Sequence, residues 1–249
     1  MDQLWIVAAA SLAGGVVQSV TGFGAAILIM IFLPLIFSMT AAPAISDVIT
    51  MTIAFAMFWR YRKSVSLRKM PLAILVYLVV STCAIHQSAF LNTGILKLSF
   101  GIFLVILAGY FLFFSGKAAV KDSLVMNMLC GGLGGLCGGL FGIAGPPVSL
   151  YYLAVSKNKE EYLGTMNAFF SITVIFNVIA RIRSGFLTVE QIPYVVWGVA
   201  AIQTGCVVGS IISGRIEMET MKKCVYALMI FAGMVSVIQG ILFLWKIPA

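Results

Sequence analysis

The chain has 249 residues, of which 61% are hydrophobic and 10% are charged, and its mean hydropathy is +1.09. This composition excludes a soluble domain, because the chain lacks the polar residues needed to cover a soluble surface. The formal net charge of +8 comes from residues between apolar runs, which favours orientation by basic cytoplasmic loops over nucleic-acid binding. We therefore expect an integral membrane protein surrounded by the lipid bilayer.

The first apolar run covers residues 4–37 and is interrupted by Gly22-Phe23-Gly24. The interruption leaves arms of about 17 and 13 residues, or roughly 25 and 20 Å as helices, each shorter than the ~30 Å hydrocarbon core. The run predicts a re-entrant hairpin or two short tilted helices. Because no basic segment precedes it and it contains no obvious cleavage site, we expect it to remain in the mature protein.

A second run, residues 124–155, contains a segment, residues 131–147, in which eight of seventeen residues are glycine. Glycine is costly in a helix and proline removes a backbone donor, so this density predicts helices that approach closely and then break. The arms, residues 124–141 and 146–155, are again predicted to be too short for conventional spans. Broken helices inside apolar runs are typical of transporters.

Six further apolar runs have the length of full membrane spans, and three of them follow each glycine-rich run. They cover residues 43–59, 71–91, 95–115, 163–180, 192–214 and 224–245. Between the first two of these spans, residues 60–69 carry five positive charges and no acid, which predicts a cytoplasmic loop.

The two halves of the chain align at an offset of 121 residues. The coinciding positions are polar or glycine: Gly14 with Gly135, Gly24 with Gly145, Ser46 with Asn167, Thr50 with Ser171, Thr52 with Thr173, Arg60 with Arg181 and Arg62 with Arg183. Such coincidences within apolar runs predict a duplication. The expected repeats are residues 1–121 and 122–249, which together form one transport domain.

Two topologies are compatible with this pattern. If each glycine-rich run crosses the membrane once, the halves are parallel and the basic residues divide ten inside to six outside. If each run is a hairpin, the halves are inverted and the division becomes twelve to four, which obeys the positive-inside rule better. We therefore predict an all-α polytopic membrane protein with two inverted-topology repeats, each a glycine-broken re-entrant helical hairpin plus three transmembrane helices.

The sequence has no catalytic or metal-binding pattern. His86 is the single histidine and no pair of candidate ligands has metal-binding spacing, so we expect neither an enzyme nor a metal or other cofactor. Asp47 and His86 are ionisable groups in or near spans and are the candidates for proton coupling. A coupling proton or another ion is an expected partner. Arg60 and Arg181 end their spans and are predicted to be topology anchors rather than substrate ligands.

An anion carrier needs a dry cavity lined by hydroxyls, backbone N–H groups and helix N-termini, which stabilise negative charge without a buried cation. Both breaks supply such groups, and the spans that follow add polar side chains. The predicted substrate-binding residues are Gln18, Ser19, Thr21, Gly22, Gly24, Ser46, Thr50, Gly142, Gly145, Pro146, Asn167, Ser171 and Asn177. The alternative is that the glycines serve close helix packing and the hydroxyls bond between helices.

The glycine-rich break before Pro146-Pro147, its echo at residues 21–24 with Pro34 beyond, and the duplication resemble the TauE/SafE family of sulfite exporters. The resemblance implies a multi-pass secondary transporter of the bacterial or archaeal inner membrane, without an ATPase domain, for sulfite, sulfonates or related small organic anions. A carrier of another small solute or of a metal ion, and a membrane assembly subunit that transports nothing, are the alternatives. The sequence leaves the oligomeric state open, a homodimer included.

Overall fold

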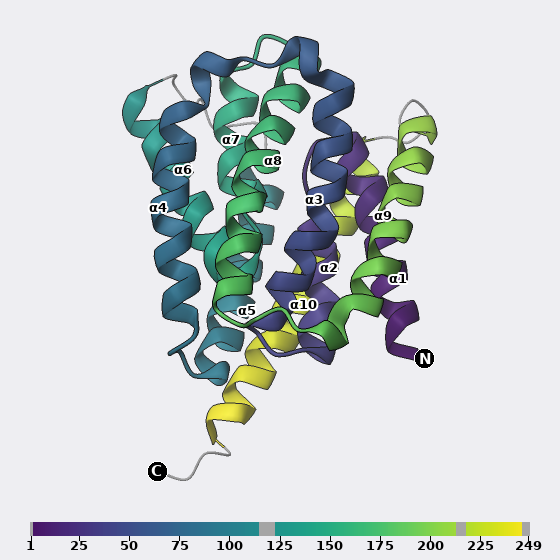
Figure 1. Ribbon diagram of the computed structural model, residues 1–249, viewed down its shortest axis with the longest axis vertical. Coiled ribbons are helices and arrows are strands. Elements are labelled where there is room, and N and C mark those ends of the chain that lie inside the picture. Colours follow the sequence, from purple (N-terminus) through teal and green to yellow (C-terminus); the bar gives the residue numbers. More distant parts are fainter. Residues whose placement is uncertain (1, 115–122, 213–217, 246–249) are drawn as a thin grey trace.

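The computed structural model describes residues 2–114, 123–212 and 218–245, and in these ranges every regular element is helical (Figure 1). The α-helices are α1 (Asp2–Thr21), α2 (Ala25–Ile36), α3 (Ala41–Tyr61), α4 (Pro71–Ser88), α5 (Thr93–Phe114), α6 (Leu124–Phe141), α7 (Gly145–Val155), α8 (Lys159–Arg183), α9 (Ile192–Ile212) and α10 (Met218–Trp245). Short 3-10 turns lie at Arg62–Ser64, Leu67–Lys69 and Val189–Gln191. The prediction of an all-helical protein is confirmed.

Within the described residues, six helices are long and apolar enough to cross a membrane: α1, α3, α4, α6, α8 and α9. The prediction that both arms of each glycine-rich run are too short is therefore wrong for the first arms. α1 has 20 residues, about 30 Å, and α6 has the predicted 18 residues, about 27 Å, which together with their apolar composition is enough to cross a membrane. The second arms, α2 and α7, have only 12 and 11 residues and are about 18 and 16 Å long.

Both short helices begin after a change of backbone direction that glycine makes possible. Gly22 and Gly24 have φ values of 84° and 110°, and Gly142 has a φ of 68°, a region that residues with a Cβ rarely adopt. α7 then begins with Pro146 and Pro147 in its first turn, where a missing N–H breaks no bond within the helix. The chain thus breaks at the positions that the glycine and proline pattern predicts.

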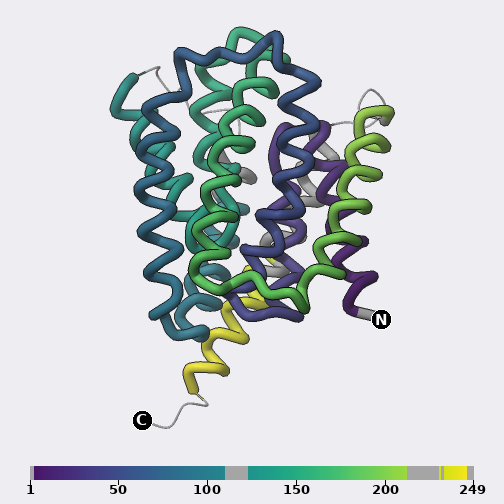
Figure 2. The backbone as a smooth tube through the Cα atoms, in the orientation of Figure 1, coloured from purple at the N-terminus to yellow at the C-terminus, as the bar shows by residue number. Residues whose placement is uncertain are grey.

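The main helix contacts combine the two halves of the chain: α1 packs against α9, α4 against α6, and α3 against α8, while α5 packs against α10. α1 and α9 run in the same direction, because Gly205 and Gly209 of α9 lie against the backbone of Leu12 and Val16 of α1. Figure 2 shows this course, with both helices rising from the end of the bundle that holds the N-terminus.

α4 and α6 run side by side in the direction opposite to α1 and α9 (Figure 1). Their contact is made by residues spaced four apart, namely Gly131, Gly135 and Gly139 of α6 and Ala73, Tyr77 and Ser81 of α4. A Cβ on any of these glycines would lie 2.7 Å from the carbonyl oxygen of its partner. The three glycines therefore serve close helix packing, the alternative that the sequence left open.

The loops gather at two ends of the bundle (Figure 1). One of them, here called the basic end, holds residues 60–69 and the turn between α7 and α8. At this end Lys69 donates to the last carbonyl of α7 and forms an ion pair with Glu161 at 2.9 Å. The opposite end holds the N-terminus, the α4–α5 turn and the α8–α9 connection. The predictions for residues 115–122 and 213–217, and for the side chains of Lys222 and Lys223, lie outside the described part of the chain.

Candidate functional site

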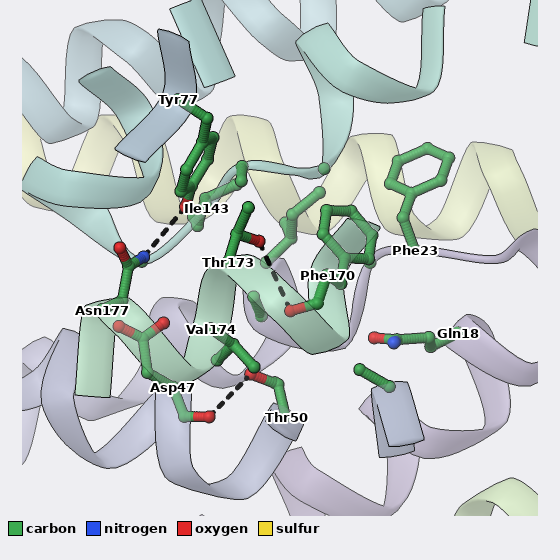
Figure 3. Close-up of a pocket in the computed structure, with 17 residues that line it drawn as sticks. Gln18, Phe23, Asp47, Thr50, Tyr77, Ile143, Phe170, Thr173, Val174 and Asn177 are labelled. Atoms are coloured by element: carbon green, nitrogen blue, oxygen red, sulfur yellow. Dashed lines mark hydrogen bonds between the residues drawn. The ribbon is translucent and has the colours of Figure 1, made fainter. Parts of the chain in front are cut away.

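A cavity lies where the starts of α2 and α7 meet, with further walls from α1, α3, α4 and α8 (Figure 3). Its volume is about 50 Å³, which is room for roughly three to five waters or one small oxyanion. Its lining residues are Gln18, Phe23, Gly24, Ala26, Ile27, Asp47, Thr50, Ala54, Tyr77, Gly142, Ile143, Ala144, Gly145, Phe170, Thr173, Val174 and Asn177.

Two helices begin at this cavity. Gly24 is the N-cap of α2 and Ala144 is the N-cap of α7, and no side chain caps either start. The first N–H groups of a helix have no partner inside it and form the positive end of its dipole. Prolines take two of these donors from α7, so α2 offers the fuller set. A Cβ at Gly145 would contact the ring of Phe23, which shows how closely the two breaks approach.

One wall of the cavity joins α4 to α8 through a hydrogen bond in which Asn177 Nδ2 donates to the Tyr77 hydroxyl at 2.9 Å (Figure 3). Both side chains are buried, and Asn177 Oδ1 has no hydrogen-bond partner among the described residues. A buried amide with an unused acceptor is suited to a polar ligand or an ordered water.

Tyr77 is absent from the predicted site, because an aromatic residue in a span is usually a packing residue. Its mid-span position, where a phenol needs a partner, is the signal that could have found it.

The structure corrects the prediction for Arg181. Its side chain is only 1% exposed, and its Nε donates to a carboxylate oxygen of Asp47 at 2.7 Å. Its Nη2 donates to the carbonyls of Gly138 and Gly139, both at 2.9 Å, in the last turn of α6. Arg181 is therefore a buried ion-pair partner and not a topology anchor. The physical reason is that α8 continues to Arg183, which is exposed, so that position 181 still faces the bundle.

The two candidates for ion coupling lie in different surroundings. Asp47 lines the cavity and is buried. His86 lies in the last turn of α4, is exposed, and packs edge-on against Phe90 with 5.4 Å between ring centroids. It is not among the residues that line the cavity. Geometry therefore favours Asp47 over His86 as a group that acts on a ligand, while ion coupling itself stays a prediction.

Of the thirteen predicted substrate-binding residues, six line the cavity: Gln18, Gly24, Thr50, Gly142, Gly145 and Asn177. The other seven are outside its lining: Ser19, Thr21, Gly22, Ser46, Pro146, Asn167 and Ser171. Their roles in binding stay predictions.

Three of these seven residues donate hydrogen bonds within their own helices in this conformation. Thr21 donates to the Val17 carbonyl, Asn167 to the Leu163 carbonyl and Ser171 to the Asn167 carbonyl, at 2.8 to 2.9 Å. Hydroxyls and amides bonded in this way belong to the local helix structure. Asn167 is still linked to the cavity, because Gln18 Nε2 lies 3.5 Å from its Oδ1.

α8 contributes a continuous face to the cavity, made by Phe170, Thr173, Val174 and Asn177. These positions follow the three- and four-residue spacing of one helix face. Asn177 was predicted, and the same spacing counted back from it would have indicated the other three. Thr173 donates its hydroxyl hydrogen to the Phe169 carbonyl at 2.9 Å, so it faces the cavity mainly with its acceptor lone pairs.

Several span-length helices and a cavity at two helix starts define this molecule as a multi-pass membrane protein with the architecture of a transporter. Among the described residues, no group of three His, Cys, Asp or Glu is placed to hold a metal ion.

The family model described as Sulfite exporter TauE/SafE matches residues 6–236, nearly the whole chain. The chain therefore belongs to the TauE/SafE sulfite exporter family and is a membrane transporter, which confirms the resemblance seen in the sequence. No curated protein and no solved structure matches the chain.

Proposed function

We propose that the protein is a secondary transporter of small oxyanions, namely sulfite, sulfonates of the sulfoacetate type or related organic anions, in the inner membrane of a bacterium or archaeon. The observation that carries this proposal is the meeting of two uncapped helix starts at one cavity of about 50 Å³. Helix N-termini stabilise anions. Two such positive helix ends inside a membrane protein therefore favour an anion as the ligand of the cavity. Four or five non-hydrogen atoms, as in sulfite or a small sulfonate head, suit this volume.

The transported anion binds between Gly24 and Ala144, with the N–H groups of α2 on one side and the Asn177 amide and Tyr77 hydroxyl on the other. The arrangement of α1 to α5 and α6 to α10 supports two inverted repeats, residues 1–121 and 122–249. Each half has a long helix, a short helix and three further helices, and α1 and α6 run in opposite directions, as do α4 and α9. A site between inverted halves is accessible from each side in turn when one half tilts against the other.

The basic end faces the cytoplasm in this proposal. Residues 60–69 carry five positive charges there, and the turn after α7 adds Lys157 and Lys159. Excess Lys and Arg in short loops orients such proteins with those loops inside.

Two measurements test the proposed function. Purified protein in detergent should gain thermal stability with millimolar sulfite or small sulfonates, because a ligand that binds only the folded state raises its apparent stability. Proteoliposomes should show flux of the same anions. Choline serves as the control solute, since a site built from helix N-termini stabilises negative charge. A membrane assembly subunit would move no anion, and a carrier of another solute or a metal ion would respond to that solute and not to these anions.

A matched pair of variants on α8 locates the site. Asn177→Leu removes an amide that lines the cavity, and it should weaken anion binding by roughly ten- to a hundredfold. Asn167→Leu makes the same chemical change ten residues earlier on the same helix, outside the cavity lining. Loss of affinity in both variants places the anion along α8 toward Gln18, as the sequence predicted. Unchanged affinity in Asn177→Leu removes the cavity from the proposal.

A further inference from the structure

The charge that lines the cavity has the wrong sign for an anion. Among the described residues of the lining, Asp47 alone is charged, and it is buried. A carboxylate beside a bound oxyanion would repel it strongly in this setting of low dielectric constant. Arg181 stands directly behind Asp47, with Nε 2.7 Å from the carboxylate. The arginine therefore neutralises the aspartate, and the wall of the cavity has no net charge.

The guanidinium of Arg181 is held in place by more than its ion pair. Nη2 donates to the carbonyls of Gly138 and Gly139, so the group keeps two contacts even if the carboxylate leaves. Nη1 is buried and has no hydrogen-bond partner among the described residues. A buried guanidinium with unused donors is costly, and an oxyanion in contact with it would satisfy them.

We propose, on the basis of the proposed function, that the Asp47 carboxylate is an internal substitute for the substrate and that the transported oxyanion displaces it from Arg181. The chemistry of the two ligands is alike, because a carboxylate, a sulfite and a sulfonate each offer planar or pyramidal oxygens that a guanidinium binds. Arg181 is then the counter-ion of the substrate. The class of substrate is a small oxyanion, one negative charge of which pairs with the Arg181 guanidinium.

Charge balance extends the proposal to a proton. Displacement leaves the Asp47 carboxylate without its cation in the protein interior, and such a group is stable only when it binds a proton. The titratable or charged groups near it are Arg181 of α8 and Tyr77 of α4, and Cys137 of α6 lies near Tyr77. The phenol and the thiol are uncharged near neutral pH, so Asp47 is the group that changes charge. One anion bound to Arg181 is therefore accompanied by one proton bound to the Asp47 carboxylate oxygen, and both leave together.

The pair has no counterpart in the other half of the chain. At the offset of 121 residues, Arg60 corresponds to Arg181, but Ala168 stands where the second half would need an acid. Arg60 is exposed, and its guanidinium lies over the ring of Tyr61 at 5.7 Å. The exchange is thus confined to the end of the cavity that faces away from the basic end.

The test titrates methanesulfonate, which stays ionised at every pH used, into the purified protein and its variants. Arg181→Gln should lower affinity by roughly ten- to a hundredfold, and Arg181→Lys, which keeps the charge, should lose less. Asp47→Asn should raise affinity about tenfold, since the internal competitor is gone. The double variant Asp47→Asn/Arg181→Gln leaves no buried unpaired charge, so it should fold, yet bind as weakly as Arg181→Gln.

A purely structural ion pair gives the opposite result. In that case each single variant loses stability and affinity together, and the double variant recovers both, which would overturn the proposal. A matched control is the ion pair at the basic end: Lys69→Gln/Glu161→Gln should leave affinity unchanged.

The proton is tested with the same ligand. Wild-type affinity should fall as pH rises, by up to tenfold per pH unit, because binding takes up a proton, and Asp47→Asn should remove this dependence. Equal slopes in the two proteins would refute the proton step. Failure of the wild type to bind any small anion would refute the proposed function itself, whereas normal binding by the double variant refutes only the exchange.

Discussion

The contact between α4 and α6 predicts that Gly135→Ala destabilises the protein although alanine favours helices. A Cβ at position 135 would lie 2.7 Å from the carbonyl oxygen of Tyr77 and 3.1 Å from its Cα. Both are backbone atoms, so no side-chain rotation can relieve the overlap and the two helices must separate. Overpacking of this kind costs about 1 to 3 kcal/mol. The movement also carries Tyr77 away from Asn177 and should weaken anion binding.

Gly132→Ala is the matched control on the same helix. There the nearest atom to an added Cβ is Val76 Cγ1 at 3.6 Å, which is ordinary contact. Both substitutions gain the same helix propensity, up to about 1 kcal/mol, so this gain cancels when the two variants are compared. The melting temperature of Gly135→Ala should therefore lie roughly 2 to 12 °C below that of Gly132→Ala. Thermal unfolding of both proteins in one detergent measures this difference, and equal melting temperatures would refute the packing argument.

Three further predictions concern other parts of the molecule. Tyr77→Phe removes the hydroxyl that accepts from Asn177 and leaves a buried amide unpaired, so stability should fall by about 1 to 3 kcal/mol in thermal unfolding and anion affinity should fall with it. Lys69→Met removes the ion pair and the bond to the end of α7, and because these groups are partly exposed the melting temperature should drop by only about 2 to 4 °C, with affinity unchanged. In a cysteine-free background, Ser64→Cys at the basic end should be labelled by an impermeant reagent only after the membrane is opened, and Ser184→Cys at the opposite end from outside; the reverse pattern would contradict the proposed orientation.

Local rules explain why the helix limits follow the sequence closely. The breaks at residues 22–24 and 142–144 depend on backbone angles that only glycine adopts easily and on prolines that fit a first helical turn. Apolar runs of span length predict helices because an unpaired backbone is too costly in lipid. α1 and α6 reach span length because a glycine that packs against a neighbouring helix does not end its own helix.

The candidate site could be predicted only in part. Gly24, Gly145 and Gln18 flank the breaks in the sequence, and the breaks themselves meet at the cavity. Whether Asn177 or Asn167 faces that cavity depends on the rotation of α8 against its neighbours, which helix spacing alone leaves undetermined. The structure places Asn177 in the lining and bonds Asn167 to its own helix.

The sequence by itself determined that this is an all-helical membrane protein, where its helices break, and to which family of transporters it is similar, because hydropathy, glycine and proline act over a few residues. Only the tertiary structure decided which polar groups meet. Asp47 and Arg181 are 134 positions apart, and the end of a span normally predicts an exposed arginine. Their pairing depends on the packing of α3, α6 and α8, which brings a carboxylate, a guanidinium and two carbonyls together in the protein interior.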